Sequence, residues 1–345
     1  MIAATLRLGA AIALTVGTAA AAATLDPRLP AYEPQPATPP KDAGYLLPDG
    51  TVHIISGNRG IGVALEGFNA LFARTHPGTK FRIDYNREGN SVNIAALAHG
   101  ITLVGPLGRE TNWLEQAIYR NIVGSEPLTI KIAHGTLTSP RMTAGLAIYV
   151  NKDNPIRKLT MDQLARIFTT GASGGDLTHW GQLGASGEWA GRPIHTYGTP
   201  ESSGYGYFML KNKWGDRPFA PGYESFELAA QIVKRVGEDR YGIGFSGQGF
   251  VTPQTRLVAL AENAAGPYME GTEQEVASGR YPLDRSVDLA IRRVPGEALD
   301  PFVKEYMRLI LSREGQAIVA AEADGYVPLN ATQIADEHAK LEDPR

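Results

Sequence analysis

From Thr51 onward, short strand-like segments alternate with segments whose apolar residues recur at helical spacing, and glycine-rich turns join them. The first unit joins a strand at 51–55 to a helix with Ile61, Leu65 and Phe68 on one face. Such alternation predicts an α/β fold on a mostly parallel sheet. A chain of 345 residues with 43% hydrophobic composition can bury one large core or two smaller ones around a cleft, and we expect two lobes.

The remaining elements follow the same patterns. Thr160 and Gln163 have the spacing of a capping box, and Asp300 followed by Pro301 provides a helix cap and a first-turn proline. Further strands are expected at 80–85, 101–104, 145–150, 241–245 and 287–293, and further helices at 89–97, 160–168, 228–236 and 301–311.

Residues 1–23 have the order of a secretory signal peptide. The basic residue Arg7 precedes an apolar run at 8–16, and small residues follow at 19–23. The run is too short for a membrane span, so we expect cleavage near Thr24 and a periplasmic location. The chain has no cysteine, which excludes a lipid anchor at the cleavage site and a disulfide framework.

Residues 24–49 form a segment of different composition. They contain seven prolines and show little apolar periodicity. This composition is typical of an extended leader or tether, and we expect the segment to lie outside the core.

The sequence also argues against several function classes. The formal net charge of −3 provides no basic field for a nucleic-acid partner. The seven histidines lack the close spacing of a metal site, and no cofactor is expected. The sequence ESSGYG around Ser203 lacks the GxSxG elbow of a serine hydrolase, so we do not expect an enzyme.

Three turns rich in glycine and hydroxyl residues, at 56–62, 89–91 and 202–206, lead into predicted helices. The first amides of a helix lack internal partners and carry the positive end of the helix dipole. Helix starts that face one point therefore form a site for an anion.

Two arginines are candidates for the charge at such a site. Arg59 lies in the first turn, and Arg109 follows the strand expected at 101–104. Their planar guanidinium groups match an oxyanion better than an ammonium group does. The alternative interpretations are a solvated loop charge for Arg59 and a surface ion pair with Glu110 or Glu115 for Arg109.

Several long segments resemble one known family. They are, in chain order, GLAIYVNKDNPIRKLTMDQLARIF, HWGQLG, RPIHTYG, RYGIGFSG, GRYPLDR and SREGQAIVAAEADGYVPLN. They resemble segments of the substrate-binding proteins of phosphate ABC transporters, and the resemblance extends from about Val52 to Leu329. It implies a two-lobed type II periplasmic-binding-protein fold with a ligand cleft between the lobes, lobe 1 comprising 50–140 plus 286–340 and lobe 2 comprising 141–285.

The resemblance also implies a function. Members of this family capture phosphate or a related oxyanion by closing their lobes about a hinge, and deliver it to an inner-membrane ABC permease. The chain is therefore expected to be a monomeric solute-binding protein with these two partners.

The family's anion contacts fall on turns that this chain matches unevenly. The sequence Gly57-Asn58-Arg59 stands where the family has glycine followed by serine or threonine, and the loop that contains Arg109 resembles the family's arginine loop. Leu103 and Thr199 replace an acidic residue and an arginine that are common in the family.

The resulting candidate ligand-binding residues are Gly57, Asn58, Arg59, Gly60, Arg109, Ser202, Ser203, Gly204 and Tyr205. Two hypotheses follow from the uneven match. The first is phosphate capture for uptake. The second is a family member with an altered cleft that acts as a sensor or partner-binding protein and has no role in transport.

Overall fold

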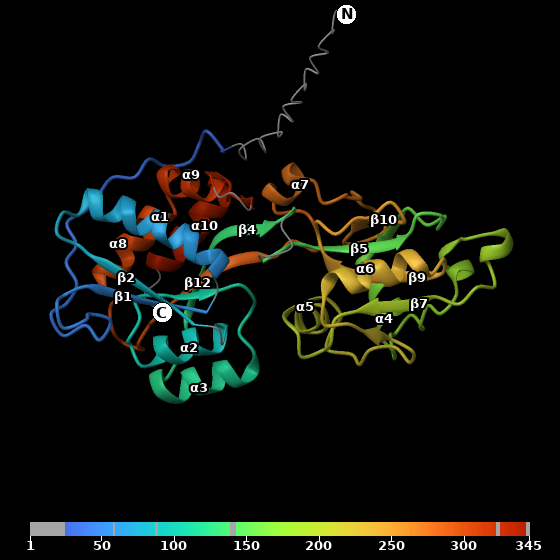
Figure 1. Cartoon of the computed structure of the whole chain (residues 1–345), viewed down its shortest axis with the longest axis horizontal. Helices are drawn as coiled ribbons and strands as arrows, with labels where there is room; N and C mark the ends of the chain where they lie inside the picture. The colour runs from blue at the N-terminus through green and yellow to red at the C-terminus, as the bar shows by residue number, and fades with distance from the viewer. Residues whose placement is uncertain (1–24, 58, 87–88, 139–142, 322–324, 343–345) are drawn as a thin grey trace, which may run out of the picture.

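The computed structural model describes residues 25–57, 59–86, 89–138, 143–321 and 325–342. The chain forms two lobes placed side by side, with the N-terminal and C-terminal segments in the same lobe (Figure 1). The segments that follow β4 and precede β12 join the lobes (Figure 1).

The first lobe contains elements from both ends of the chain. From its N-terminal part come β1 (Val52–Ser56), α1 (Arg59–Thr75), β2 (Phe81–Tyr85), α2 (Asn90–Ala98), β3 (Gly105–Leu107), α3 (Trp113–Val123) and β4 (Leu128–Thr136). From its C-terminal part come β12 (Ser286–Ile291), α8 (Pro301–Ile310), α9 (Arg313–Ala321), β13 (Tyr326–Val327) and α10 (Ala331–Glu342).

The second lobe is formed by the middle of the chain. Its strands are β5 (Leu146–Asn151), β6 (Lys158–Thr160), β7 (His195–Gly198), β8 (Glu224–Ser225), β9 (Gly242–Gly247), β10 (Thr255–Leu257) and β11 (Ala259–Ala261). Its helices are α4 (Met161–Phe168), α5 (Gly204–Phe208), α6 (Ala229–Glu238) and α7 (Glu273–Ala277), with short helical turns η1 (Trp180–Leu183), η2 (Gly187–Trp189) and η3 (Met209–Lys213).

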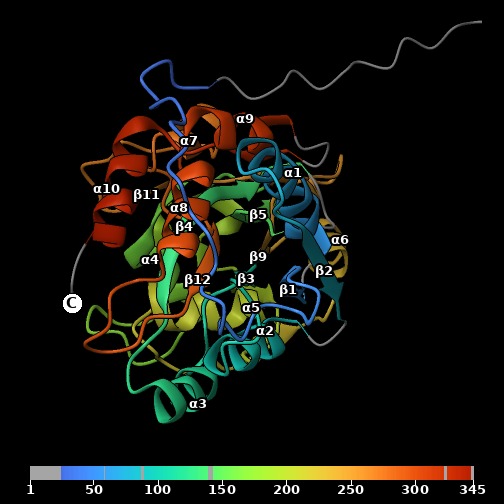
Figure 2. The ribbon, with the colours of Figure 1, turned by 90° about the vertical axis from the view of Figure 1, so that its left-hand side faces the viewer.

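Each lobe has its own hydrophobic core. In the first lobe, α1 and α8 contribute Phe68, Phe72 and Phe302, all fully buried. Helices α9 and α10 pack on β4, while α2 packs on β3 and β12 (Figure 2). In the second lobe, Trp180 and Trp214 are buried in a separate cluster with residues of α4, β5 and β9. None of the described helices combines the length and the hydropathy needed to cross a bilayer.

The α/β class and the two lobes are confirmed, but the expectation of a mostly parallel sheet is wrong. In the first lobe, the sheet of order β13-β4-β12-β3 is antiparallel throughout. In the second lobe, the sheet of order β10-β5-β9-β7-β8 is mixed. Strand β4 precedes the second lobe in the chain and β12 follows it, and the two strands pair antiparallel next to the lobe junction. The predicted strand-helix-strand crossover, which gives parallel neighbours, does not join them.

Most predicted elements are present, and the local helix signals act as expected. Thr160 and Gln163 form the capping box of α4, and Asp300 caps α8 with Pro301 in the first turn. The prediction of a strand at 101–104 is wrong, because β3 begins only at Gly105. Leu103 and Val104 are apolar because they are fully buried, not because they belong to a strand ladder.

The proline-rich segment is the third correction. Leu29 and Tyr45, at 1% and 7% exposure, belong to the core of the first lobe. The backbone N–H of Arg313 donates to the carbonyl of Pro30 at 2.7 Å, and the Tyr32 hydroxyl donates to Glu305 Oε1 at 2.7 Å. Proline favours an extended chain but does not prevent single side chains from packing, so the absence of periodicity did not indicate exposure. We call residues 25–46 the N-terminal strap.

Candidate anion-binding cleft

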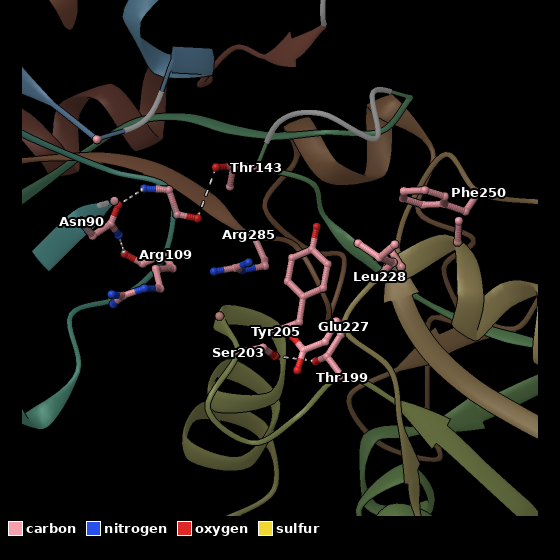
Figure 3. Close-up of a pocket in the computed structure, with 16 residues that line it drawn as sticks. Asn90, Arg109, Thr143, Thr199, Ser203, Tyr205, Glu227, Leu228, Phe250 and Arg285 are labelled. Atoms are coloured by element: carbon pink, nitrogen blue, oxygen red, sulfur yellow. Dashed lines mark hydrogen bonds between the residues drawn. The ribbon is translucent and has the colours of Figure 1, made fainter. Parts of the chain in front are cut away.

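A cavity of about 770 Å³ lies between the lobes. Figure 3 shows that its walls carry side chains from both lobes and from the segment that leads into β12. The lining residues are Gly57, Gly89, Asn90, Gly108, Arg109, Thr143, Thr199, Ser203, Gly204, Tyr205, Glu227, Leu228, Ala229, Ala230, Phe250 and Arg285.

In the first lobe, three segments meet at the cavity wall. The backbone N–H of Gly57 donates to Asn93 Oδ1 at 2.8 Å, and Asn93 Nδ2 donates to the carbonyl of Pro106 at 2.6 Å. A Cβ atom at position 57 would lie 2.1 Å from the carbonyl oxygen of Gly89, so only glycine allows this approach. The turn after β1, the start of α2 and strand β3 are thereby held together.

Asn90 connects the start of α2 to the loop that carries Arg109. Its Nδ2 donates to the carbonyl of Arg109 at 3.1 Å, and the side chain is 6% exposed. Thr143, from the other side of the lobe junction, donates to the carbonyl of Gly108 at 3.2 Å. These bonds fix the backbone of the arginine loop from two directions (Figure 3).

Arg109 lines the cavity and is also paired with Glu115, so both sequence interpretations describe part of its environment. Its Nη2 and Nη1 donate to Glu115 Oε1 at 2.7 Å and Oε2 at 2.9 Å. Burial opposes ionisation of Glu115, but hydrogen bonds from Arg109, Ser91 and the N–H of Asn112 outweigh it and lower the pKa of this carboxyl. The Glu115 side chain is 4% exposed and the Arg109 side chain 26%, so the arginine is held firmly, and its aliphatic stem lies beside Gly204.

In the second lobe, Ser203 organises the start of α5. Its Oγ donates to Thr199 Oγ1 at 2.7 Å and accepts from the N–H of Gly206 at 3.0 Å. A Cβ atom on the adjacent Gly204 would lie 3.3 Å from Arg109 Cδ, so the two lobes approach closely at this point. Ser203, and not the exposed Ser202, faces the cavity.

The predicted residues therefore divide into three groups. Gly57, Arg109, Ser203, Gly204 and Tyr205 are brought together around the cavity, whereas Gly60 and Ser202 are outside its lining. Asn58 and the side chain of Arg59 lie outside what the structure describes, although Arg59 begins α1.

Sequence reasoning missed several lining residues, including Asn90, Glu227 and Arg285. Asn90 lies within a turn that the sequence did single out, and Arg285 is the last residue of the motif GRYPLDR. Their positions at a helix start and at the end of a motif were available signals. Glu227 lies in a segment without any local pattern and could not have been identified.

Arg285 is the second arginine of the cavity. Its side chain is 2% exposed, and its Nη2 donates to Glu110 Oε2 at 3.1 Å. Its Cζ lies 5.3 Å from the centre of the Tyr205 ring and 5.2 Å from that of Phe208, within the range of cation–π attraction.

This arrangement is suited to binding a small anion. Two arginines, a serine and the glycines of two turns line one space. The lining residues include no histidine, lysine or cysteine that could activate Ser203 as a nucleophile. Within the described parts of the chain, no cluster of three His, Asp or Glu side chains is placed to hold a metal ion.

Comparison with known proteins decides the family. A family model described as a PBP superfamily domain matches residues 49–314. Phosphate-binding protein PstS of Pseudomonas aeruginosa is 32% identical over 334 residues, which cover 95% of each chain. The chain belongs to the phosphate-binding protein family.

Solved structures of phosphate-binding proteins show the same fold. PstS from Borrelia burgdorferi has a TM-score of 0.54 at 18% identity, over 81% of this chain and 99% of that one. An ABC-type phosphate transport receptor from Vibrio cholerae has a TM-score of 0.52 at 21% identity, over 79% of this chain and 98% of that one. The fold is the two-lobed type II fold of periplasmic binding proteins.

Proposed function

We propose that this protein captures phosphate in the cleft between its lobes and delivers it to an ABC permease in the inner membrane. The observation that carries the proposal is the convergence of Arg109, Arg285 and Ser203 on one cavity. The similarity to PstS over 95% of the chain supports the same ion. These features favour a binding protein rather than an enzyme.

The size of the cavity supports capture by lobe closure. At about 770 Å³, it is far larger than a tetrahedral oxyanion, so one ion cannot contact all of its walls at once. Closure about the lobe junction would bring Ser203 and the arginine loop onto the ion together. We place the lobe boundaries at 50–140 plus 286–340 and at 141–285, in keeping with the two separate cores.

Glu227 provides a basis for ion selectivity. It is an exposed carboxylate on the cavity wall of the second lobe (Figure 3). Hydrogen phosphate carries a proton that a carboxylate can accept, whereas sulfate carries none at neutral pH and would be repelled. The selectivity should therefore favour phosphate and arsenate over sulfate.

Isothermal titration with phosphate, arsenate, sulfate and molybdate tests the proposal. Phosphate at a hundred times its dissociation constant should stabilise the protein by about 2.7 kcal/mol. If none of these ions produces heat of binding or a shift in Tm, capture is contradicted. That outcome would favour the second hypothesis, a sensor or partner-binding protein, which the replacements at Leu103 and Thr199 motivate.

The cellular route is part of the same proposal. Residues 1–23, interpreted as a signal peptide, lie outside the described residues, and the periplasmic location rests on their sequence and on the family. N-terminal sequencing of the exported protein should find a mature chain that starts near Thr24. Retention of the intact N-terminus in a cytoplasmic fraction would contradict export.

A further inference from the structure

Arg285 is a buried cation with few partners. Its side chain is 2% exposed, yet its Nε forms no hydrogen bond. Its one ion pair in the described structure is the single contact from Nη2 to Glu110. A buried guanidinium normally requires most of its donors to be satisfied, because each unpaired buried donor costs about 1–3 kcal/mol. Arg285 therefore has a hydrogen-bond donor that the described structure leaves unsatisfied.

Arg109 provides the contrast. It makes two hydrogen bonds to Glu115, and that carboxylate also accepts from Ser91 Oγ at 2.6 Å and from the N–H of Asn112 at 2.9 Å. An anion that entered the cleft would have to break this whole network to take the full charge of Arg109. Its charge is already neutralised inside the first lobe.

Glu110 holds Arg285 much less firmly. The Glu110 side chain is 29% exposed and shares one hydrogen bond of 3.1 Å with the arginine. It lies on the partly buried loop that follows Arg109, and its own partial exposure gives the carboxylate a route into solvent. Figure 3 shows the Arg285 side chain extending into the cavity in the region between Arg109 and Tyr205.

We propose that Arg285 is the cation that receives the bound anion, and that Glu110 occupies it in the empty cleft until the anion displaces the carboxylate. The inference rests on the proposed function, since it names the residue that carries the charge for the same site. An incoming oxyanion can accept from Nη2 and from the unpartnered Nε in one planar, bidentate contact. Tyr205 and Phe208 hold the guanidinium plane in place from the second lobe.

The displacement gives opposite expectations for the two partners. Removal of the arginine should weaken phosphate binding by about 30-fold or more, as expected for one partner of a desolvated charge pair. Removal of the competing carboxylate should tighten it about two- to fivefold, as expected for a partly exposed ion pair.

The experiment is a double-mutant cycle of Arg285→Gln and Glu110→Gln, with inorganic phosphate titrated calorimetrically at fixed ionic strength. Arg240→Gln is the matched control. Arg240 also pairs with one glutamate, Glu188, and its Cζ lies 5.2 Å from the ring centre of Trp189, but it is not part of the cavity wall. Its Kd should equal that of the wild type.

The outcomes distinguish a protein that does not bind phosphate from one that binds phosphate without Arg285. Absence of phosphate binding by the wild type overturns the proposed function itself. A wild type that binds, together with an Arg285→Gln variant within twofold of it, overturns only the role of Arg285. If Arg285→Gln does not fold, Glu110→Gln alone decides, and a Kd equal to or above that of the wild type overturns the displacement. If both variants fold, the gain from Glu110→Gln must vanish in the Arg285→Gln background, because a general charge effect would persist there.

Discussion

Arg109 and Glu115 form a bidentate ion pair in which the carboxylate is almost fully buried and the arginine lines the cleft. The pair joins the arginine loop to the first turn of α3, where Glu115 also completes a capping box with Asn112. One carboxylate therefore orients a candidate ligand-binding side chain and stabilises a helix start.

Glu115→Gln is expected to destabilise the protein by about 2 kcal/mol, because it leaves the part-buried Arg109 without its counter-charge. For a domain of this size, Tm should fall by about 4–8 °C. Glu126→Gln is the control, since it breaks an exposed pair with Arg120 near the other end of α3 and should change stability by less than about 0.5 kcal/mol. Equal effects of the two substitutions in thermal unfolding would argue against a special role for Glu115.

Ser203→Ala is expected to weaken phosphate binding about tenfold, through loss of a hydroxyl that can turn its proton from Thr199 to a bound anion. It should also cost about 1 kcal/mol of stability, because Ser203 Oγ caps α5. Ser202→Ala changes the neighbouring hydroxyl, which is exposed and outside the cavity wall, and should bind phosphate as the wild type does. Calorimetry and thermal unfolding of both variants separate the two effects. A larger loss of affinity in Ser202→Ala would reverse the assignment.

Asp288 should make stability depend on pH. It lies in β12 between Leu107 of β3 and Lys131 of β4, and burial raises its pKa to about 7, although a hydrogen bond from Ser286 acts in the opposite direction. Between its unfolded pKa of 3.8 and about 7, the folded chain holds a proton that the unfolded chain has lost. This contribution to the free energy of unfolding therefore decreases as pH rises through that window, and then levels off.

Asp288→Asn removes the ionisation and keeps an acceptor for Ser286. We expect the variant to be more stable than the wild type at pH 8 by about 2 kcal/mol, and to lose part of the decrease in stability between pH 4 and 7. Urea unfolding at pH 5 and pH 8 measures both quantities. Asp162→Asn, at a side chain that is 72% exposed, should keep the wild-type profile. A variant that is less stable than the wild type at pH 8 would contradict the raised pKa.

The N-terminal strap should contribute to the stability of the first lobe. Leu29→Ala removes a side chain that is 1% exposed in the core and should cost about 2–4 kcal/mol. The exposed Glu33, in the same segment, should tolerate replacement by alanine within about 0.5 kcal/mol. Urea unfolding compares the two variants. An unchanged free energy of unfolding in Leu29→Ala would show that the strap only covers the lobe.

What could be predicted from the sequence depended on how far apart the interacting residues lie. Thr160 with Gln163, and Asp300 with Pro301, act within one helical turn, so their spacing was sufficient. The antiparallel pairing of β4 with β12 joins residues more than a hundred positions apart, and no local pattern encodes its direction.

The same limit applies to the cleft. Gly57 and Ser203 could be predicted from the sequence, because glycine turns and helix starts are local signals. The importance of Arg285 depends on Glu110 and Tyr205, which reach it from distant parts of the chain. Leu29 was misjudged because a single buried side chain in an extended segment produces no periodicity.

The distribution of the two cores sets an order in which the chain can fold. Apart from Val327, the core of the second lobe is drawn from one continuous stretch, from Leu146 to Leu283, and can form as soon as that stretch is free. The core of the first lobe joins Leu29 to residues as late as Leu341, so it stays open until the last helix has emerged. Any polypeptide that ends before α8 therefore has a second lobe able to collapse and a first lobe with its apolar surface exposed to solvent and to proteases.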